Sequence, residues 1–114
     1  MKLKYFTFDN INIIYDKFRE ELDIYQLPHL GLPLDYGMGD ICLEEDNNLF
    51  KFYIVNRSEK YNYEEFNNIE DGINKLVTYY DNYDLVDDSN KMERIMYQTL
   101  GLQKDKTLSL KKEL

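Results

Sequence analysis

The stretch Leu49–Val55, LFKFYIV, is the most apolar and β-prone part of the chain, and it restricts the fold more than any other segment. Alternating side chains would place Phe50, Phe52 and Ile54 on one face of a strand. The opposite face mixes aromatic, apolar and basic groups, which is typical of a half-covered surface. Shorter β-like runs flank this stretch, beyond polar breaks at 47–48 and 56–60. The pattern predicts an antiparallel meander over Asp40–Phe66.

Three other segments have apolar residues at the 3-and-4 spacing that predicts amphipathic helices. We expect these helices at Asn10–Tyr25, Asn68–Tyr83 and Asn90–Leu100, with Gly101 as a C-terminal stop. Gly72 falls within the second helix, where glycine costs about 1 kcal/mol relative to alanine. We expect it to permit close approach to the sheet. The expected N-cap residues are, in chain order, Asp9 or Asn10, Asn67 or Asn68, and Ser89.

The segments between and beside these elements complete the expected fold. Met1–Phe8 is expected as an edge strand or an ordered lead-in. The segment Gln26–Asp40 holds both prolines and three of the five glycines, which predicts an irregular connection, and its many apolar residues favour packing across the sheet. Residues 1–102 are thus expected to form a single α+β domain, an antiparallel meander sheet of three to five strands with two to three helices packed on one side. Residues 103–114 are expected to be a mobile, basic C-terminal tail, in which Leu108 and Leu110 could add a short edge strand.

Charge is distributed unevenly along the 114 residues. The net charge is −8, but four lysines against two acids give 103–114 a net charge of +2, which leaves −10 for the rest. An acidic body repels nucleic acid and anionic lipid, and it attracts a basic partner. The equally weighted alternative is that the acidic charge only keeps the protein soluble.

Three features of the sequence favour a cytoplasmic protein. No apolar run approaches the ~20 residues that span a bilayer. The N-terminal MKLKYFTFDN has no apolar h-region, so it does not resemble a signal peptide. The single cysteine, Cys42, has no partner within the chain for a disulfide, which fits a reducing compartment.

Catalytic chemistry has no recognisable signature in this sequence. His29 is the only histidine, and it has no second metal-ligating group at a recognisable spacing. Cys42 has no basic neighbour that would activate it, so it is expected to be a small core residue. The acidic run that begins at Asp81 lacks the glycine of a calcium loop, and no phosphate-binding or nucleophile-elbow motif occurs. We therefore expect no catalytic residue, no metal site and no cofactor.

Tyrosines interleaved with acids are the most distinctive surface feature. The chain has 11 tyrosines and no tryptophan. Tyrosine is enriched at protein interfaces, and neighbouring carboxylates could receive the lysines and arginines of a partner. An AT-rich genome would also raise the tyrosine content, and the acidic run could be a solvated connector. The contact candidates are Tyr61, Tyr63, Tyr83, Asp81, Asp84, Asp87 and Asp88, with Glu44, Glu45 and Asp46 as a second patch.

The order of elements across Leu34–Tyr80 resembles that of small bacterial immunity proteins of polymorphic toxin systems. The resemblance lies in ICLEEDNNLFKFYIVNRSEKYNYEEF followed by NNIEDGINKLVTYY, although Gly72 stands where alanine is usual. It implies a cytoplasmic protein that binds a cognate toxin domain, often a basic nuclease, and blocks it by steric occlusion. The matching helix-entry positions are Phe66, Ile69, Ile73 and Leu76.

Two other functions stay open at the level of sequence. One is a phage- or plasmid-type accessory interaction module without enzymatic activity, which could form a homodimer through the half-covered sheet face. The other is a small-molecule binder that uses the apolar loop Leu27–Met38 as a lid.

Overall fold

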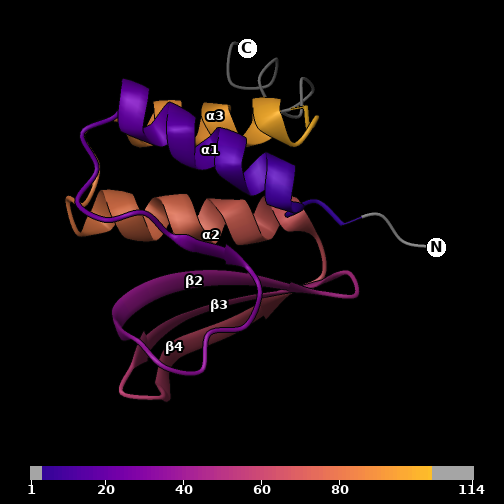
Figure 1. The fold of residues 1–114 in the computed structure, drawn as a ribbon, viewed down its shortest axis with the longest axis vertical. Helices are drawn as coiled ribbons and strands as arrows, with labels where there is room; N and C mark the ends of the chain where they lie inside the picture. Colours follow the sequence, from indigo (N-terminus) through magenta and orange to yellow (C-terminus); the bar gives the residue numbers. More distant parts are fainter. Residues whose placement is uncertain (1–3, 104–114) are drawn as a thin grey trace, which may run out of the picture.

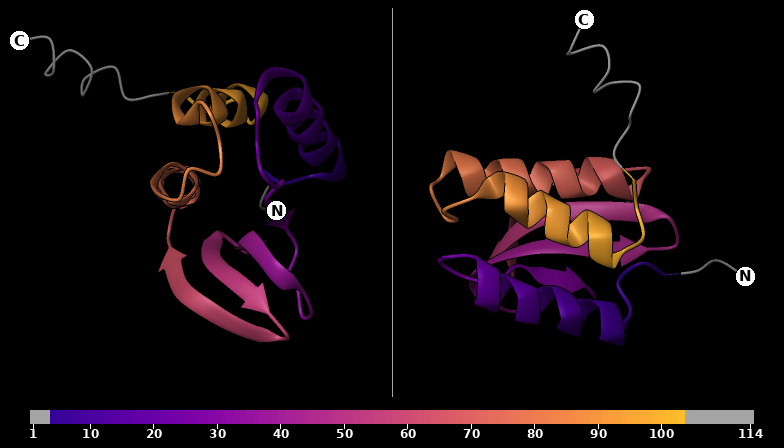
Figure 2. Two further views of the ribbon diagram at one scale, coloured as in Figure 1. Left: turned by 90° about the vertical axis from the view of Figure 1, so that its left-hand side faces the viewer. Right: turned by 90° about the horizontal axis from the view of Figure 1, so that it is seen from above.

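The computed structural model describes residues 4–103, which form a four-stranded sheet with three helices on one side of it (Figures 1 and 2). Helix α2 lies between the sheet and a layer made by α1 and α3 (Figure 1). The expected α+β class, with its helices on one side of the sheet, is confirmed. The elements are α1 (Phe8–Glu21), β1 (His29–Gly31), β2 (Met38–Asp46), β3 (Leu49–Asn56), β4 (Glu59–Phe66), α2 (Ile69–Asn82) and α3 (Ser89–Thr99).

The sheet is mixed, which corrects the expectation of a purely antiparallel one. Strands β2, β3 and β4 form the expected antiparallel meander, but β1 pairs in parallel with β2, with Leu30 opposite Leu43. Three residues between two prolines are too few to show a strand periodicity, so the sequence indicated only an irregular connection. Gly31 ends β1 with φ 96°, a conformation that residues with a Cβ rarely adopt.

Helix α1 is displaced toward the N-terminus relative to the expected Asn10–Tyr25. Its cap is Thr7, whose side chain accepts the N–H of Asn10, so the expected caps Asp9 and Asn10 are wrong. The Asn10 amide instead donates to the Tyr5 carbonyl at 2.7 Å. Residues 4–7 form no strand, and Phe6 is buried, which makes them an ordered lead-in.

The other two helices lie close to their expected positions. Asn68 caps α2, as expected, by accepting the N–H of Asp71 at 2.8 Å. The cap of α3 is Asp88 rather than Ser89, which is the first residue of that helix. Gly101 follows α3 with φ 70°, the left-handed conformation of a helix stop, as expected.

Gly72 brings α2 close to the sheet. A Cβ at this position would lie 3.1 Å from Leu43 Cδ1 and 3.3 Å from Phe50 Cβ. The expectation that Gly72 permits close approach is therefore confirmed. The core that α2 helps to close contains the apolar face of β3 and is completed by α1 and α3; its largest fully buried members include Phe18, Phe50, Phe52, Ile73, Leu76, Tyr80 and Met92.

The outer face of the sheet, which points away from the helices, is partly covered. Cys42, Tyr53 and Val55 are fully buried there, and Leu34 from the loop after β1 packs against them. The Leu34 N–H donates to the Tyr53 hydroxyl at 3.3 Å. This arrangement confirms both the half-covered face and the packing of the apolar loop across the sheet.

Two expectations concern membranes and the tail. No helix among residues 4–103 is both long and apolar enough to cross a membrane. The expected mobile tail, including Leu108 and Leu110, lies outside the described residues except for Gln103.

We predict that Gly72→Val lowers the free energy of unfolding by about 1–3 kcal/mol, because the new side chain would overlap Leu43 and Phe50. Urea unfolding of the variant and the parent protein measures this difference. Asn74→Val, at an exposed site of the same helix, is the matched control and should change the stability by less than about 0.5 kcal/mol. Equal midpoints for the parent protein and Gly72→Val would show that α2 does not depend on this close contact.

Candidate functional site

The C-terminal end of α2 gathers carboxylates and tyrosine and carries no basic residue in its last turn. The unsatisfied carbonyls of a last helical turn give that end a partial negative charge. Asp81 adds a full negative charge, and the capping residue Tyr83 is 62% exposed. Asp84 follows with φ 55°, a left-handed conformation that aspartate adopts more readily than most residues. This end of α2 therefore favours a positively charged neighbour.

The acidic connector between α2 and α3, residues 83–88, pairs with residues 23–25, which follow α1. Ile24 and Val86 form an antiparallel bridge, and the N–H of Tyr25 donates to the Leu85 carbonyl at 2.8 Å. Asp23 and Asp87 bond twice, once through backbone groups and once from the Asp23 N–H to the Asp87 carboxylate, each at 3.0 Å. The pairing explains why α1 ends before residue 22, short of the expected Tyr25.

This pairing creates an acidic hollow of about 460 Å³ next to the end of α2. Asp23 and Tyr25 join Asp84 and Asp87 in its lining, and Tyr25 is 79% exposed. No pattern in the sequence placed Asp23 and Tyr25 here, because they lie about 60 residues from Asp84 and Asp87 along the chain.

A second hollow, of about 400 Å³, lies between β4 and the last turns of α2. We call it the aromatic hollow. The ring of Tyr79 packs against Phe52 with centroids 5.5 Å apart and against Tyr83 with centroids 4.6 Å apart. Asn62, Tyr63, Glu64, Lys75, Thr78 and Asn82 complete its lining.

A cation already occupies part of the aromatic hollow. The Lys75 ammonium lies 5.6 Å from the centroid of the Phe52 ring and 3.3 Å from a carboxylate oxygen of Glu64. Both side chains of this ion pair are partly exposed, so it contributes at most about 1 kcal/mol to stability. The hollow is thus a place where an aromatic ring and a carboxylate receive a positive charge together.

The two hollows adjoin through consecutive residues, since Tyr83 lines the aromatic hollow and Asp84 lines the acidic one. We call the combined region the α2-end surface. Of the expected contact residues, it brings together Tyr83, Asp84 and Asp87. Tyr63 also lines the aromatic hollow, but its ring lies on the outer face of the sheet, against Tyr53.

A bulge in β4 separates the two tyrosines that were expected to share one face. The register of β3 and β4 shifts between Phe52 and Ile54, and Asn62 has φ 55°. The extra residue places Tyr61 opposite Ile54, on the helix side, whereas the Tyr63 ring stacks on Tyr53, on the outer face, with centroids 6.0 Å apart. An asparagine in left-handed conformation inside a strand gave no recognisable signal in the sequence.

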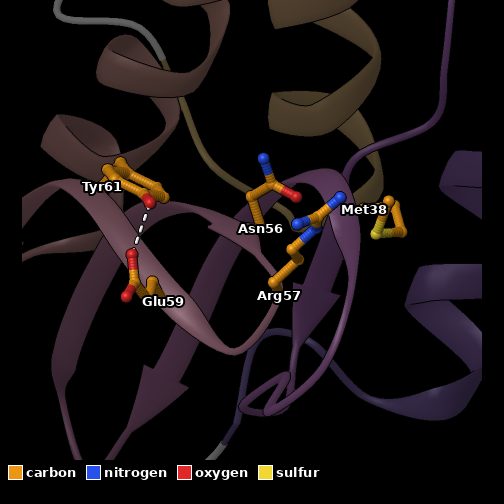
Figure 3. A pocket seen from close by; sticks show the side chains of 5 residues that line it. All are labelled: Met38, Asn56, Arg57, Glu59 and Tyr61. Carbon is orange, nitrogen blue, oxygen red and sulfur yellow. Dashed lines mark hydrogen bonds between the residues drawn. The ribbon is translucent and has the colours of Figure 1, made fainter.

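Tyr61 therefore belongs to a third hollow, of about 440 Å³, at the β3–β4 turn (Figure 3). Its hydroxyl donates to Glu59, and Met38, Asn56 and Arg57 line the hollow beside this pair.

Several of the acidic contact candidates also have bonds within the fold. Asp81 accepts the Ser89 hydroxyl at 3.0 Å, and Asp88 caps α3 by accepting the Lys91 N–H at 2.9 Å. Together with the bonds of Asp87, these contacts leave Asp84 as the aspartate of this run whose carboxylate makes no hydrogen bond or ion pair among residues 4–103.

The second expected patch is only partly at the surface. Glu44 and Glu45 are 5% and 6% exposed, whereas Asp46 is exposed. The Glu45 carboxylate accepts the N–H groups of Tyr5 and Phe6 at 3.0 and 2.9 Å, which anchors the lead-in to α1. The expectation of an exposed patch is thus wrong for Glu44 and Glu45, because the fold uses both carboxylates internally.

Glu44 belongs to a polar network on the outer face of the sheet. It accepts the Tyr53 hydroxyl at 2.9 Å and pairs with the Lys51 ammonium at 3.5 Å. Lys60 lies 4.6 Å above the centroid of the Tyr53 ring. Burial raises the pKa of the Tyr53 hydroxyl, and the bond to Glu44 raises it further, so Tyr53 stays a hydrogen-bond donor at neutral pH.

Cys42 and His29 are the two residues whose side chains were considered for catalysis or metal binding, and both contact other parts of the fold. Burial raises the pKa of the Cys42 thiol to about 12, so the thiol is protonated at neutral pH. A ring nitrogen of His29 lies 2.9 Å from the Leu32 carbonyl. Within residues 4–103, no three His, Cys, Asp or Glu side chains are grouped so that they could hold a metal ion.

Comparison of the chain with models of known families, with curated proteins and with solved structures found no match. The resemblance to immunity proteins therefore stays a prediction, and function is inferred from the residues and their geometry.

We predict that Glu45→Ala lowers the free energy of unfolding by about 2–3 kcal/mol, because it deprives two backbone N–H groups of their acceptor. Asp46→Ala, on the same strand but exposed, should cost less than about 0.5 kcal/mol. Urea titration compares the two. Similar small losses would mean that Glu45 does not hold the N-terminal lead-in.

We predict that Cys42 in the native protein reacts with a disulfide reagent at about pH 8.5 on the order of a thousandfold more slowly than in urea, since its thiolate is scarce and buried. Stopped-flow absorbance follows the reaction. Equal rates in both states would contradict the buried, protonated thiol.

The raised pKa of the Cys42 thiol also affects stability. The contribution of this group to stability is lost as pH rises above 9.0, its ordinary pKa, toward about 12.

Proposed function

We propose that this protein is a cytoplasmic immunity or inhibitor protein that binds a basic toxin domain and blocks it by steric occlusion. The observation that carries the proposal is the α2-end surface. There, exposed tyrosines and carboxylates from two distant parts of the chain adjoin a helix end that has no basic residue. Large aromatic contact area combined with negative charge suits a basic protein surface.

Occlusion needs a rigid surface, and the contacts beneath the α2-end surface provide one. The Tyr80 hydroxyl, on the buried side of α2, donates to the Gln26 carbonyl at 2.7 Å. The bridge between Ile24 and Val86 fixes the connector on the same side. A surface held in this way loses little conformational entropy when it binds a partner.

We predict that co-expression with the protein encoded immediately upstream recovers a basic partner that is released as the salt concentration rises, because screening weakens charge pairing. Asp84→Lys should weaken partner binding on the order of tenfold at low salt. Asp35→Lys, at an exposed site on the loop after β1, is the matched control and should leave affinity within about twofold. Calorimetry or surface plasmon resonance with the recovered partner measures both affinities.

An unchanged affinity for Asp84→Lys would rule out the connector as part of the interface. Recovery of the protein alone, with no basic partner, would count against the inhibitor function itself.

A non-enzymatic interaction module that forms a homodimer is the second candidate, and one observation favours it. Strand β4 is the edge of the sheet, and all of its residues except Phe66 are exposed. Unpaired strand edges are templates for a second chain, although the bulge at Asn62 opposes regular pairing. The outer face of the sheet offers less apolar surface for a dimer contact, because Leu34 of the loop after β1 covers its apolar centre. Light scattering that gives a dimeric mass, with no partner recovered, would favour this module.

A further inference from the structure

We propose that the aromatic hollow binds an arginine side chain of the partner, with the guanidinium against the Tyr79 and Tyr83 rings and paired with Glu64. This inference rests on the proposed function, since it assigns a chemical group to the basic partner. The hollow suits an arginine because it combines ring faces with a carboxylate, and a planar cation can stack on the first and pair with the second.

The rings are placed to receive a flat group. Tyr79 lies in the last turn of α2 and Tyr83 caps the helix, with their ring centroids 4.6 Å apart and their planes inclined by 39°. Tyr79 is supported from behind by Phe52, at 5.5 Å, and Phe52 is fully buried. Tyr83 is 62% exposed, so a ring face remains open to a partner. A supported ring next to an open one gives contact area at little entropic cost.

Lys75 shows how a cation sits in this hollow. Its ammonium lies over Phe52 and 3.3 Å from Glu64, which is half exposed. An incoming guanidinium can replace the ammonium at Glu64, because the lysine stem is flexible and its head is partly in solvent. Arginine gains more than lysine in this exchange, since its weakly hydrated, planar group stacks on a ring and donates two parallel bonds to a carboxylate.

The surroundings add attraction for a positive charge. The negative end of the α2 dipole lies at Tyr83, with no lysine or arginine in the last turn. Asp84 follows Tyr83 directly in the sequence, and Asp81 precedes Tyr83 by two residues. The bulge at Asn62 is part of the lining as well, and bulges commonly redirect side chains next to binding sites.

A peptide titration tests the hollow without the partner. The probe is acetyl-Gly-Arg-Gly-amide, compared with the same peptide carrying citrulline, a neutral near-isostere, or lysine. Two-dimensional NMR of the full chain follows the amides of Thr78 and Asn82, which line the hollow. We expect saturable shifts at these residues with the arginine peptide, several-fold weaker binding of the lysine peptide and no saturable shift with citrulline. Equal binding of all three peptides, or shifts confined to other parts of the chain, would overturn the proposal.

Two pairs of variants separate the hollow from general charge attraction. Tyr83→Ala should weaken binding of the arginine peptide at least about fivefold. Tyr36→Ala, at another exposed tyrosine but on the loop after β1, should leave that binding unchanged. Lys75→Met should strengthen binding of the arginine peptide, because the competing cation is gone. The gain should be larger than for Lys17→Met, which makes the same charge change on α1. Equal effects within either pair would show that charge alone attracts the peptide.

Failure of the proposed function and failure of the arginine site give different experimental results. If the parent protein captures a basic partner and Tyr83→Ala captures it with unchanged affinity, the arginine site is wrong and the inhibitor function stands. If no partner is captured but the peptide titration gives the expected pattern, the hollow binds arginine and the inhibitor function is wrong.

Discussion

The close contact at Gly72 sets how near α2 lies to the sheet, and the remaining helices pack beyond α2. Because a glycine faces Leu43 and Phe50, the helix axis can approach the sheet closely enough for both neighbouring turns to bury their apolar side chains. The opposite side of α2 then receives α3, and α1 packs against α3 (Figure 2). The far end of the same helix carries the tyrosines of the candidate site. The position of that site is therefore a consequence of the core.

The acidic residues of this chain divide into two groups with different physical roles. Glu44, Glu45 and Asp88 are bonded to hydroxyl, ammonium or backbone N–H groups and hold the fold together. Burying a carboxylate is costly unless such donors surround it, and here they do. Asp84 lies at the surface, where its charge acts on molecules that approach. Net charge alone does not distinguish the carboxylates that hold the fold from those that lie exposed at the surface.

The sequence predicted the elements whose signal is local and periodic. The meander, the three helices and the roles of Asn68, Gly72 and Gly101 follow from alternation, 3-and-4 spacing and backbone preferences. The features it missed depend on distant partners. Strand β1 exists because it pairs with β2, and Glu45 is buried because it meets the backbone of residues 5–6. The bulge at Asn62 inverts the alternation of β4, so a strict period of two assigned Tyr61 and Tyr63 to the same face. Asp23 and Tyr25 reached the site through a bridge that no local pattern indicates.

Hydrogen exchange of the chain alone and in complex with the co-expressed partner shows whether the partner binds at the α2-end surface. We expect slower exchange on binding across residues 78–87 and 23–25, with the β2–β3 turn at residues 47–48 unchanged as an internal control. Protection confined to that turn, or to the loop after β1, with residues 78–87 unaffected, would place the interface elsewhere on the molecule.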